Sequence, residues 1–368
     1  MTKFNVKIFG AGSIGNHLAY ACRGMDWDVT ICDPDSSALD RTKKLIYPER
    51  YGSWDDSIRL CTLNEIPDEK FDFVIIGTPP DSHIKIALDV LSKETPKGIL
   101  IEKPLCTPDL EGAQDLYTAA KDKGVNVFVG YNHTLGFNTV TTDKLLEENK
   151  IGNCITINGG FMEHWGGIFK AHPWLSGPED TYLGYMELGG GACGEHSHAI
   201  NIWQHFANSL GKGRIVEVSA RMDIVDEGNG RYDRICDISV KTEEGLVGTI
   251  IQDVVTQPSR KTMLLQGDKG FIEWHVAYES GDDAVISKNE DGPIEKNIIK
   301  RLRTDDFRLE IEHIGSVLAG DISDSPISIE RGLDTMMVIA ATNMSHEQNR
   351  VMKIDYSKGY NMSSITPI

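Results

Sequence analysis

Short apolar runs alternate with amphipathic segments through the first third of the chain. The apolar runs are rich in Val, Ile and Phe, as is typical of parallel strands that are buried on both faces. This rhythm predicts strands over residues 6–9, 28–32, 71–76, 98–101 and 126–129, and helices after Gly15, over 84–91 and from Thr107 to about Lys123. Strands that are separated by helices in this way predict a doubly wound parallel sheet.

From about Ile151 the pattern changes to longer runs in which apolar and polar residues alternate. Such alternation is typical of strands with one buried and one exposed face. Expected strands cover residues 215–220, 235–240, 246–255, 263–266 and 271–275, and expected helices cover about 306–318 and 329–346. The sequence therefore predicts two domains, residues 1–133 and an α+β domain over 134–368, with the C-terminal helix packing back on the first domain.

Composition and charge argue against several classes of protein. The chain of 368 residues holds 37 Lys and Arg against 55 Asp and Glu, and its formal charge of −18 repels nucleic-acid phosphates and anionic membrane surfaces. No stretch approaches about 18 uninterrupted apolar residues, and no charged-then-apolar leader opens the chain. The seven cysteines are scattered without a C-x-x-C pair, which favours reduced thiols. We expect a cytoplasmic protein without nucleic-acid, membrane or metal partners.

A glycine-rich turn follows the first expected strand. Gly10, Gly12 and Gly15 have the G-x-G-x-x-G spacing. In a dinucleotide site the first glycine allows a tight turn, the second admits the pyrophosphate, and the third lets helix and strand pack closely. Ser13 and Ile14 lie within this turn, where the phosphates would face free amide groups and the positive end of the dipole of the helix that follows Gly15.

An acidic residue ends the second expected strand. Asp33 lies 18 residues after Gly15, where a carboxylate accepts hydrogen bonds from an adenosine ribose and repels a 2′-phosphate. No arginine follows until Arg41, so the pattern favours NAD over NADP. The alternative is an ordinary βα turn in which Asp33 caps a helix.

Three further expected strands end in loops with polar side chains. In an open parallel sheet, loops at the carboxyl ends of the strands line the ligand crevice. The candidate cofactor-binding residues in these loops are Thr78, Pro79, His83, Glu102, Lys103 and Asn132. His83 is better explained as a residue that begins the next helix than as a residue with a chemical role.

An irregular aromatic stretch lies between Phe161 and Gly191. Its length and composition suggest a substrate loop, in which Trp165 and Trp174 either stack on the substrate or pack the loop itself. Three glycines and then His196 and His198 end the stretch. On a single helix with the apolar residues that follow, His196 falls within the apolar stripe and His198 on the opposite side.

These motifs together resemble the glucose-fructose oxidoreductase/inositol dehydrogenase/rhizopine catabolism (Gfo/Idh/MocA) family. The residues that carry the resemblance are Gly10 to Gly15, Asp33, Thr78-Pro79-Pro80, Glu102-Lys103-Pro104, Gly189 to Gly191, His198, Phe307, Glu310 and Pro326 to Glu330. The resemblance implies an α/β protein, with an N-terminal Rossmann domain and a C-terminal α+β domain whose large, mostly antiparallel open sheet forms contacts in a homo-oligomer, a dimer or tetramer.

The resemblance also implies NAD(P)-dependent hydride transfer between nicotinamide and a secondary alcohol of a sugar, polyol or sugar derivative. It identifies Lys103 as the site lysine, on a Lys103-Pro104 bond that is a candidate for the cis form, and His198 as the catalytic histidine. Oxidation of an alcohol needs a base near pH 7 and a cation for the developing alkoxide, and these two residues supply both.

The chain departs from the family pattern at one position. The family's D-x-G-x-H motif places an acid four residues before the histidine, where this chain has Gly194. Glu195, three residues before His198, either substitutes for that acid as a catalytic and substrate-binding residue or is a plain helix N-terminal glutamate.

Three other functions remain alternatives. An NAD-dependent glycosidase would use a transient oxidation, and a non-catalytic regulatory protein would bind NAD and a partner protein. A metal enzyme would need ligands among His196, His198, Glu163, His164, His172 and Cys193, which have no familiar ligand spacing.

Overall fold

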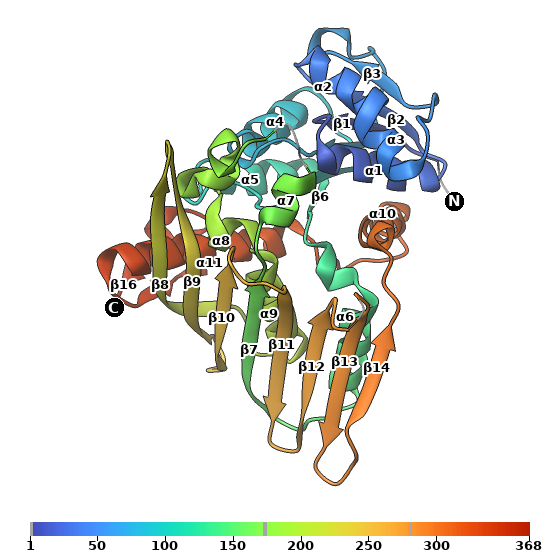
Figure 1. The fold of residues 1–368 in the computed structure, drawn as a ribbon. Coiled ribbons are helices and arrows are strands. Elements are labelled where there is room, and N and C mark those ends of the chain that lie inside the picture. The colour runs from blue at the N-terminus through green and yellow to red at the C-terminus, as the bar shows by residue number, and fades with distance from the viewer. Residues whose placement is uncertain (1–2, 172–174, 280) are drawn as a thin grey trace. The chain divides into compact units, whose positions relative to one another are not determined.

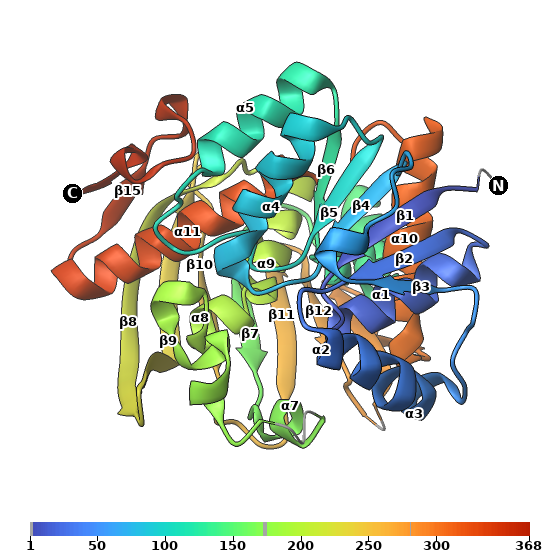
Figure 2. The ribbon, with the colours of Figure 1, turned by 90° about the horizontal axis from the view of Figure 1, so that it is seen from above.

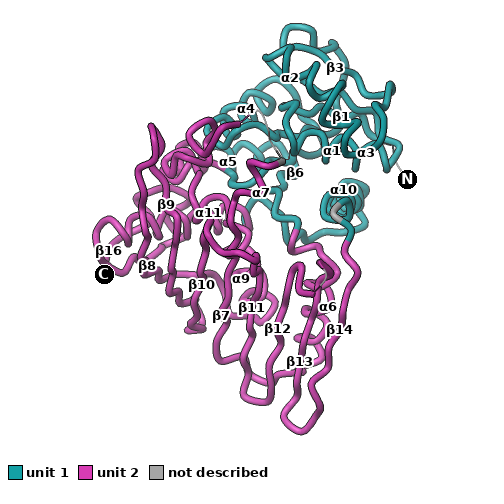
Figure 3. The backbone as a smooth tube through the Cα atoms, viewed as in Figure 1, with its two compact units in different colours: residues 1–105, 115–132, 302–330 teal, residues 106–114, 133–301, 331–368 magenta. Residues whose placement is uncertain are grey.

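A computed structural model describes residues 3–171, 175–279 and 281–368. Trp174, which the sequence suggested as a substrate-binding residue, lies outside the described residues, as does His172. The chain divides into two compact units, each made of separate segments (Figure 3). Unit 1 comprises residues 1–105, 115–132 and 302–330, and unit 2 comprises residues 106–114, 133–301 and 331–368.

The six-stranded parallel sheet of unit 1 confirms the predicted doubly wound sheet. Its strand order is β3-β2-β1-β4-β5-β6, and the order reverses between β1 and β4. A reversal of this kind marks where ligands bind in open α/β sheets. The strands are β1 (Asn5–Phe9), β2 (Asp28–Cys32), β3 (Arg59–Cys61), β4 (Phe73–Ile76), β5 (Gly98–Ile101) and β6 (Asn126–Val129).

Helices pack against the sheet of unit 1, as seen in Figure 2. The larger ones are α1 (Ser13–Gly24), α4 (Pro80–Lys93), α5 (Ala113–Lys123) and α10 (Arg303–Ala319), and the short ones are α2 (Ser36–Arg41), the π-helix η1 (Thr42–Ile46) and α3 (Tyr47–Tyr51). α10, from late in the chain, packs on α1, where the rings of His17 and Phe307 stack with centroids 4.6 Å apart.

The prediction of a helix from Thr107 is wrong at its start, because α5 begins at Ala113. Leu110 and Gly112 have φ angles of 60° and 73°, which a right-handed helix does not allow. Residues 107–112 are therefore turns, and residues 106–114 group with unit 2.

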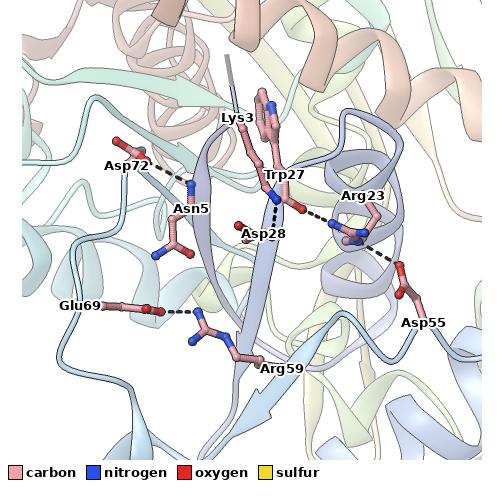
Figure 4. Close-up of polar contacts among 9 residues, drawn as sticks. All are labelled: Lys3, Asn5, Arg23, Trp27, Asp28, Asp55, Arg59, Glu69 and Asp72. Atoms are coloured by element: carbon pink, nitrogen blue, oxygen red, sulfur yellow. Dashed lines mark hydrogen bonds and ion pairs between the residues drawn. The ribbon is translucent and has the colours of Figure 1, made fainter. Parts of the chain in front are cut away.

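Polar contacts tie strand ends and helix ends together in unit 1 (Figure 4). Arg23, near the end of α1, donates to the Trp27 carbonyl at 2.6 Å and to the Asp55 carboxylate at 2.9 Å. The backbone amide of Asn5 donates to Asp72 at 3.1 Å. These bonds satisfy backbone groups where the regular ladders end.

Unit 2 holds a ten-stranded sheet that is mostly antiparallel, which confirms the predicted α+β domain (Figure 1). Its order is β14-β13-β12-β11-β7-β10-β9-β8-β15-β16, and β7 pairs in parallel with β10. The strands are β7 (Cys154–Met162), β8 (Ile215–Glu227), β9 (Gly230–Thr242), β10 (Val247–Asp253), β11 (Arg260–Gly267), β12 (Gly270–Val276), β13 (Asp283–Asn289), β14 (Glu295–Ile299), β15 (Met352–Ile354) and β16 (Ile365–Pro367).

The buried face of this sheet packs against helices. They are α6 (Phe137–Glu147), α7 (Gly166–Ala171), α8 (Gly191–Glu195), α9 (His198–Ser209) and α11 (Ile329–Gln348), and short 3₁₀ turns cover 132–135, 178–180, 182–184, 186–188, 356–358 and 362–364. Trp203 of α9 is fully buried and its indole N–H donates to the Ile157 carbonyl of β7 at 2.9 Å. On the other face, Val247 and Ile251 of β10 and Ile235 of β9 stay exposed.

All seven cysteines lie among the described residues and are buried, and none of them forms a disulfide bond. In the described part of the chain, no helix is long and apolar enough to cross a membrane.

Candidate active site

The glycine turn after β1 gives each glycine a distinct role. Gly10 has a φ of 105°, and a Cβ on it would lie 2.7 Å from the Gly77 carbonyl oxygen. A Cβ on Gly15 would lie 2.0 Å from the Gly10 carbonyl oxygen, so α1 and the turn approach too closely for any side chain. A Cβ on Gly12 would meet nothing within 4 Å, because this exposed residue borders open space at the start of α1. That open space suits a diphosphate facing the helix N-terminus.

Asp33 is held in place at the end of β2. One carboxylate oxygen accepts the Ala11 amide at 2.8 Å, and the other accepts the Asp35 amide at 2.9 Å. The fixed, half-buried carboxylate retains lone pairs for ribose hydroxyls and places negative charge where a 2′-phosphate would lie. The turn and Asp33 together fit NAD.

Arg50 of α3 reaches the same turn, although nothing in the sequence indicated it. Its guanidinium donates to the Ser13 carbonyl oxygen at 2.9 Å and to the Ser13 hydroxyl oxygen at 2.7 Å. Ser13 and Ile14 open α1 and are both half-buried. The two partners lie 37 residues apart, so no local motif connects them.

His83 joins two of the candidate loops and is fully buried. Its Nε2 lies 2.6 Å from the Thr78 carbonyl oxygen and its Nδ1 lies 3.1 Å from the Pro104 carbonyl oxygen. Burial lowers the pKa of His83. The ring therefore braces the loop after β4 against the cis Lys103-Pro104 segment. Pro79 is exposed and precedes the first residue of α4.

The loop after β5 places a buried acid beside the candidate lysine. Glu102 is 7% exposed, and one of its carboxylate oxygens accepts the Lys103 amide at 3.2 Å. Lys103 itself is half-buried. Glu310 of α10 is fully buried with neither carboxylate oxygen hydrogen-bonded, and burial together with the charge of Glu102 raises its pKa well above the usual value. Asn132, also half-buried, opens the turn that follows β6.

In unit 2, the glycine-rich segment before His198 is fixed to the sheet. Asp233 of β9 accepts the Cys193 amide at 2.8 Å, and Gln252 of β10 donates to the Cys193 carbonyl oxygen at 3.2 Å. A Cβ on Gly194 would lie 2.0 Å from the Gly189 carbonyl oxygen, so Gly194 has no room for the family's acid. Burial raises the pKa of Asp233 to about 8.

The expectation that one helix carries both histidines is wrong. α8 ends at Glu195 and α9 begins at His198, so the helical angles between these residues do not apply. His196 caps α8 and is 4% exposed, and its Nε2 lies 3.4 Å from the Glu163 carbonyl oxygen. His198 is half-buried, and its ring stands edge-on to His133 with centroids 4.7 Å apart.

A charged and polar group lies in the same unit and is termed the Glu163 cluster; it comprises Glu163, Tyr182, Glu195 and Lys261. The Lys261 ammonium lies 2.6 Å from a Glu163 carboxylate oxygen. Burial favours the neutral form of Glu163, but Lys261 outweighs it and holds the pKa of Glu163 below its usual value. The Tyr182 hydroxyl donates to Glu195 at 3.3 Å. Sequence reasoning did not single out Glu163 as a substrate ligand.

Trp165 packs into the loop's own core. It is 8% exposed and clusters with Leu183, Ala192, Tyr232 and Val254. Of the two roles expected for Trp165, this placement corresponds to packing of the loop and not to stacking on the substrate. In residues 3–171, 175–279 and 281–368, no three His, Cys, Asp or Glu side chains are grouped so that they could hold a metal ion.

Comparison with known proteins places both parts of the chain in one family. A family model described as an oxidoreductase family with an NAD-binding Rossmann fold matches residues 4–131. The model of the GFO/IDH/MocA C-terminal domain matches residues 139–273.

Two curated relatives match part of the chain. A levoglucosan dehydrogenase of Pseudarthrobacter phenanthrenivorans is 27% identical over 170 residues, which cover 45% of this chain and 42% of the relative. The uncharacterized oxidoreductase YhhX of Escherichia coli is 33% identical over 118 residues, or 32% of each chain. These alignments thus span less than half of each relative.

Solved structures match nearly the whole fold. A levoglucosan dehydrogenase in complex with NADH and L-sorbose aligns with a TM-score of 0.77 at 19% identity, covering 96% of this chain and 99% of that one. The aldose-aldose oxidoreductase of Caulobacter crescentus, complexed with glycerol, aligns with a TM-score of 0.73 at 17% identity, covering 96% and 100%.

Proposed function

Because the chain belongs to the Gfo/Idh/MocA family of NAD-binding oxidoreductases, we propose that it is a dehydrogenase for a secondary alcohol of a sugar, polyol or sugar derivative. The observation that carries the proposal is the half-buried His198 in the same unit as the Glu163 cluster. Carboxylates, a phenol and an ammonium provide the donors and acceptors that several hydroxyl groups require. The names of the relatives, levoglucosan dehydrogenase and aldose-aldose oxidoreductase, point to the same substrate class.

We assign cofactor binding to unit 1 and substrate binding to unit 2. The residues proposed to hold NAD are Gly10, Gly12, Ser13, Ile14, Gly15, Asp33, Thr78, Pro79, Glu102, Lys103 and Asn132, with His83 bracing their loops. When bound, the nicotinamide provides the acceptor for a hydride. The fixed carboxylate of Asp33 supports NAD rather than NADP.

The acid–base chemistry is assigned to two side chains. The imidazole of His198 accepts the proton of the substrate hydroxyl, since a neutral imidazole is a suitable base near pH 7. The ammonium of Lys103 stabilises the negative charge that develops on the substrate oxygen. Glu195, which accepts a hydrogen bond from Tyr182, takes the substrate-orienting role of the acid that the family carries where this chain has Gly194.

The test is absorbance at 340 nm with NAD and, separately, NADP across free sugars, inositols, sugar acids and anhydrosugars. We expect NADH formation by the wild type and its loss in Lys103→Ala and His198→Ala, with NADH binding retained in His198→Ala, whose side chain is not among the residues proposed to hold NAD. Lys93→Ala is the matched control, because Lys93 is an exposed unit 1 lysine paired with Asp89. Turnover that survives both site substitutions contradicts the proposal, and glycosidic cleavage without net NADH would identify a glycosidase instead.

We also propose a homo-oligomer, a dimer or tetramer, formed through the open face of the ten-stranded sheet. Val247, Ile251 and Ile235 lie on this face and are 49%, 38% and 38% exposed. A hollow of about 470 Å³ on the same sheet is lined by side chains that include Thr249, Ser239 and Lys241. Apolar side chains exposed together favour association. Light scattering should show an oligomer for the wild type and a monomer for Ile251→Arg.

The cysteine chemistry supports a cytoplasmic location, which we propose with the function. All seven thiols are free and buried, as suits a reducing compartment.

A further inference from the structure

We propose that Arg50 is a phosphate-recognition residue of the NAD site, acting with Ser13 on the diphosphate. The inference rests on NAD binding by unit 1 and not on the identity of the substrate. Arg50 comes from α3, a helix that is not part of the glycine turn. No element of the dinucleotide motif predicts a cation at this position.

The position of the Arg50 guanidinium is set by packing of its helix on α1. The Tyr51 hydroxyl lies 2.6 Å from Nδ1 of His17, and the rings of Tyr51 and Tyr20 stack with centroids 3.8 Å apart. Tyr47, at the start of α3, is 3% exposed. These contacts hold α3 against α1, so the arginine reaches Ser13 from an ordered helix rather than from a loose loop.

The hydrogen bonds of Arg50 leave Ser13 prepared for an anion. Ser13 Oγ accepts from Arg50 at 2.7 Å, so its own proton can be donated elsewhere. The other bond, 2.9 Å to the Ser13 carbonyl oxygen, fixes the guanidinium beside the first turn of α1. Arg50 is half-buried, and a planar guanidinium suits phosphate oxygens better than an ammonium does.

The surroundings favour a negatively charged ligand at this point. α1, all of whose residues are described, has no acidic residue in its first turn, and no side chain caps it at Gly12. The space next to Gly12 is open. Free amides, a hydroxyl and a guanidinium therefore come together at one helix end, in a chain whose formal charge is −18. The cation offsets the repulsion that this overall charge exerts on a diphosphate.

The test compares ligands with and without the diphosphate. Binding of NADH, ADP-ribose and adenosine is measured by fluorescence titration and calorimetry for the wild type and Arg50→Gln. We expect Arg50→Gln to bind NADH and ADP-ribose about tenfold more weakly and adenosine within about twofold of wild type. The salt dependence of NADH affinity should also become shallower.

Arg59→Gln is the matched control. Arg59 is an exposed residue of β3 in the same unit, where it pairs with Glu69 (Figure 4). Arg59→Gln removes the same charge as Arg50→Gln, and we expect its affinity for all three ligands to equal that of the wild type. Equal losses in both variants would mean a general charge effect and would overturn the proposal.

Two further variants separate recognition from a structural role. Arg50→Lys keeps the positive charge but loses the planar guanidinium with its paired N–H donors, and it should bind NADH with an affinity between those of the wild type and Arg50→Gln. In a Ser13→Ala background, Arg50→Gln should lower NADH affinity by a smaller factor than it does in the wild type, because Arg50 and Ser13 act together on the diphosphate. Full NADH affinity in Arg50→Gln, or an equal loss for NADH and adenosine, overturns the proposal. If Arg50→Gln fails to fold, an NADH affinity of Arg50→Lys equal to that of the wild type overturns it. A wild type that binds NADH without turning over any sugar would contradict the proposed function alone.

Discussion

Alanine at Gly15 should lower the stability of the fold, whereas alanine at Gly12 should lower NADH affinity, although the two glycines are three residues apart in one motif. The Gly15 Cβ would lie 2.0 Å from the Gly10 carbonyl oxygen, a backbone atom that no side-chain rotation can move. Relief requires α1 to shift away from the turn, and overpacking of this kind costs about 1–3 kcal/mol. That is a large fraction of the roughly 5–15 kcal/mol by which domains are stable.

Gly12→Ala meets no neighbour, since nothing lies within 4 Å of its Cβ position and its φ of −81° is ordinary for alanine. Its free energy of unfolding without cofactor should stay within about 1 kcal/mol of wild type, a difference set by the weaker helix cap. The added methyl group would occupy the space assigned to the diphosphate. NADH affinity should therefore fall by more than about tenfold.

The assay is urea unfolding with and without NADH, combined with fluorescence titration. At 100 times its dissociation constant NADH should stabilise the wild type by about 2.7 kcal/mol and Gly12→Ala by much less. Gly15→Ala should unfold at lower urea even without NADH. Gly12→Ala that binds NADH as tightly as wild type, or Gly15→Ala that is as stable as wild type, would refute this assignment of the two glycines.

Three other substitutions test separate parts of the structure. Asp233→Asn should change how stability depends on pH, because the raised pKa of about 8 keeps Asp233 protonated in the native state, while in the unfolded chain it ionises from about pH 4. The stability of the wild type relative to the variant should therefore fall between about pH 4 and 8. Urea midpoints that differ by the same amount at about pH 5 and at about pH 8 would count against this. His83→Ala should destabilise the protein by about 2–4 kcal/mol in urea unfolding, because a buried ring that contacts two loops is lost; a change under about 0.5 kcal/mol would show that the brace is unimportant. Lys261→Met should raise the pKa of Glu163, so the acid limb of the kcat/KM profile should move to higher pH, and an unshifted profile would place the pair outside the substrate site.

Local patterns predicted most of unit 1 correctly. The five strands read from apolar runs are all present, because strands buried on both faces leave an unmistakable sequence signal. The glycine spacing and Asp33 also matched the geometry, since each depends on backbone within a few residues of the turn.

Features that depend on distant partners could not be read in this way. Arg50 reaches Ser13 across 37 residues. β3, β7, β13, β15 and β16 were not predicted, nor was β14, whose first four residues are exposed and show no alternation. The break between α8 and α9 was also missed, because Asp233 and Gln252, which hold α8, come from strands much later in the chain.

The return of α10 to unit 1 affects the order in which the protein can fold during synthesis. The helix supplies the ring that stacks on His17, and a Cβ on its Gly315 would lie 3.2 Å from Trp27. A ribosome releases this segment only after residues 133–301 of unit 2 have emerged. The nascent nucleotide-binding unit must therefore wait with one face of α1 uncovered, and truncation before residue 302 should yield an aggregation-prone fragment rather than an independent domain.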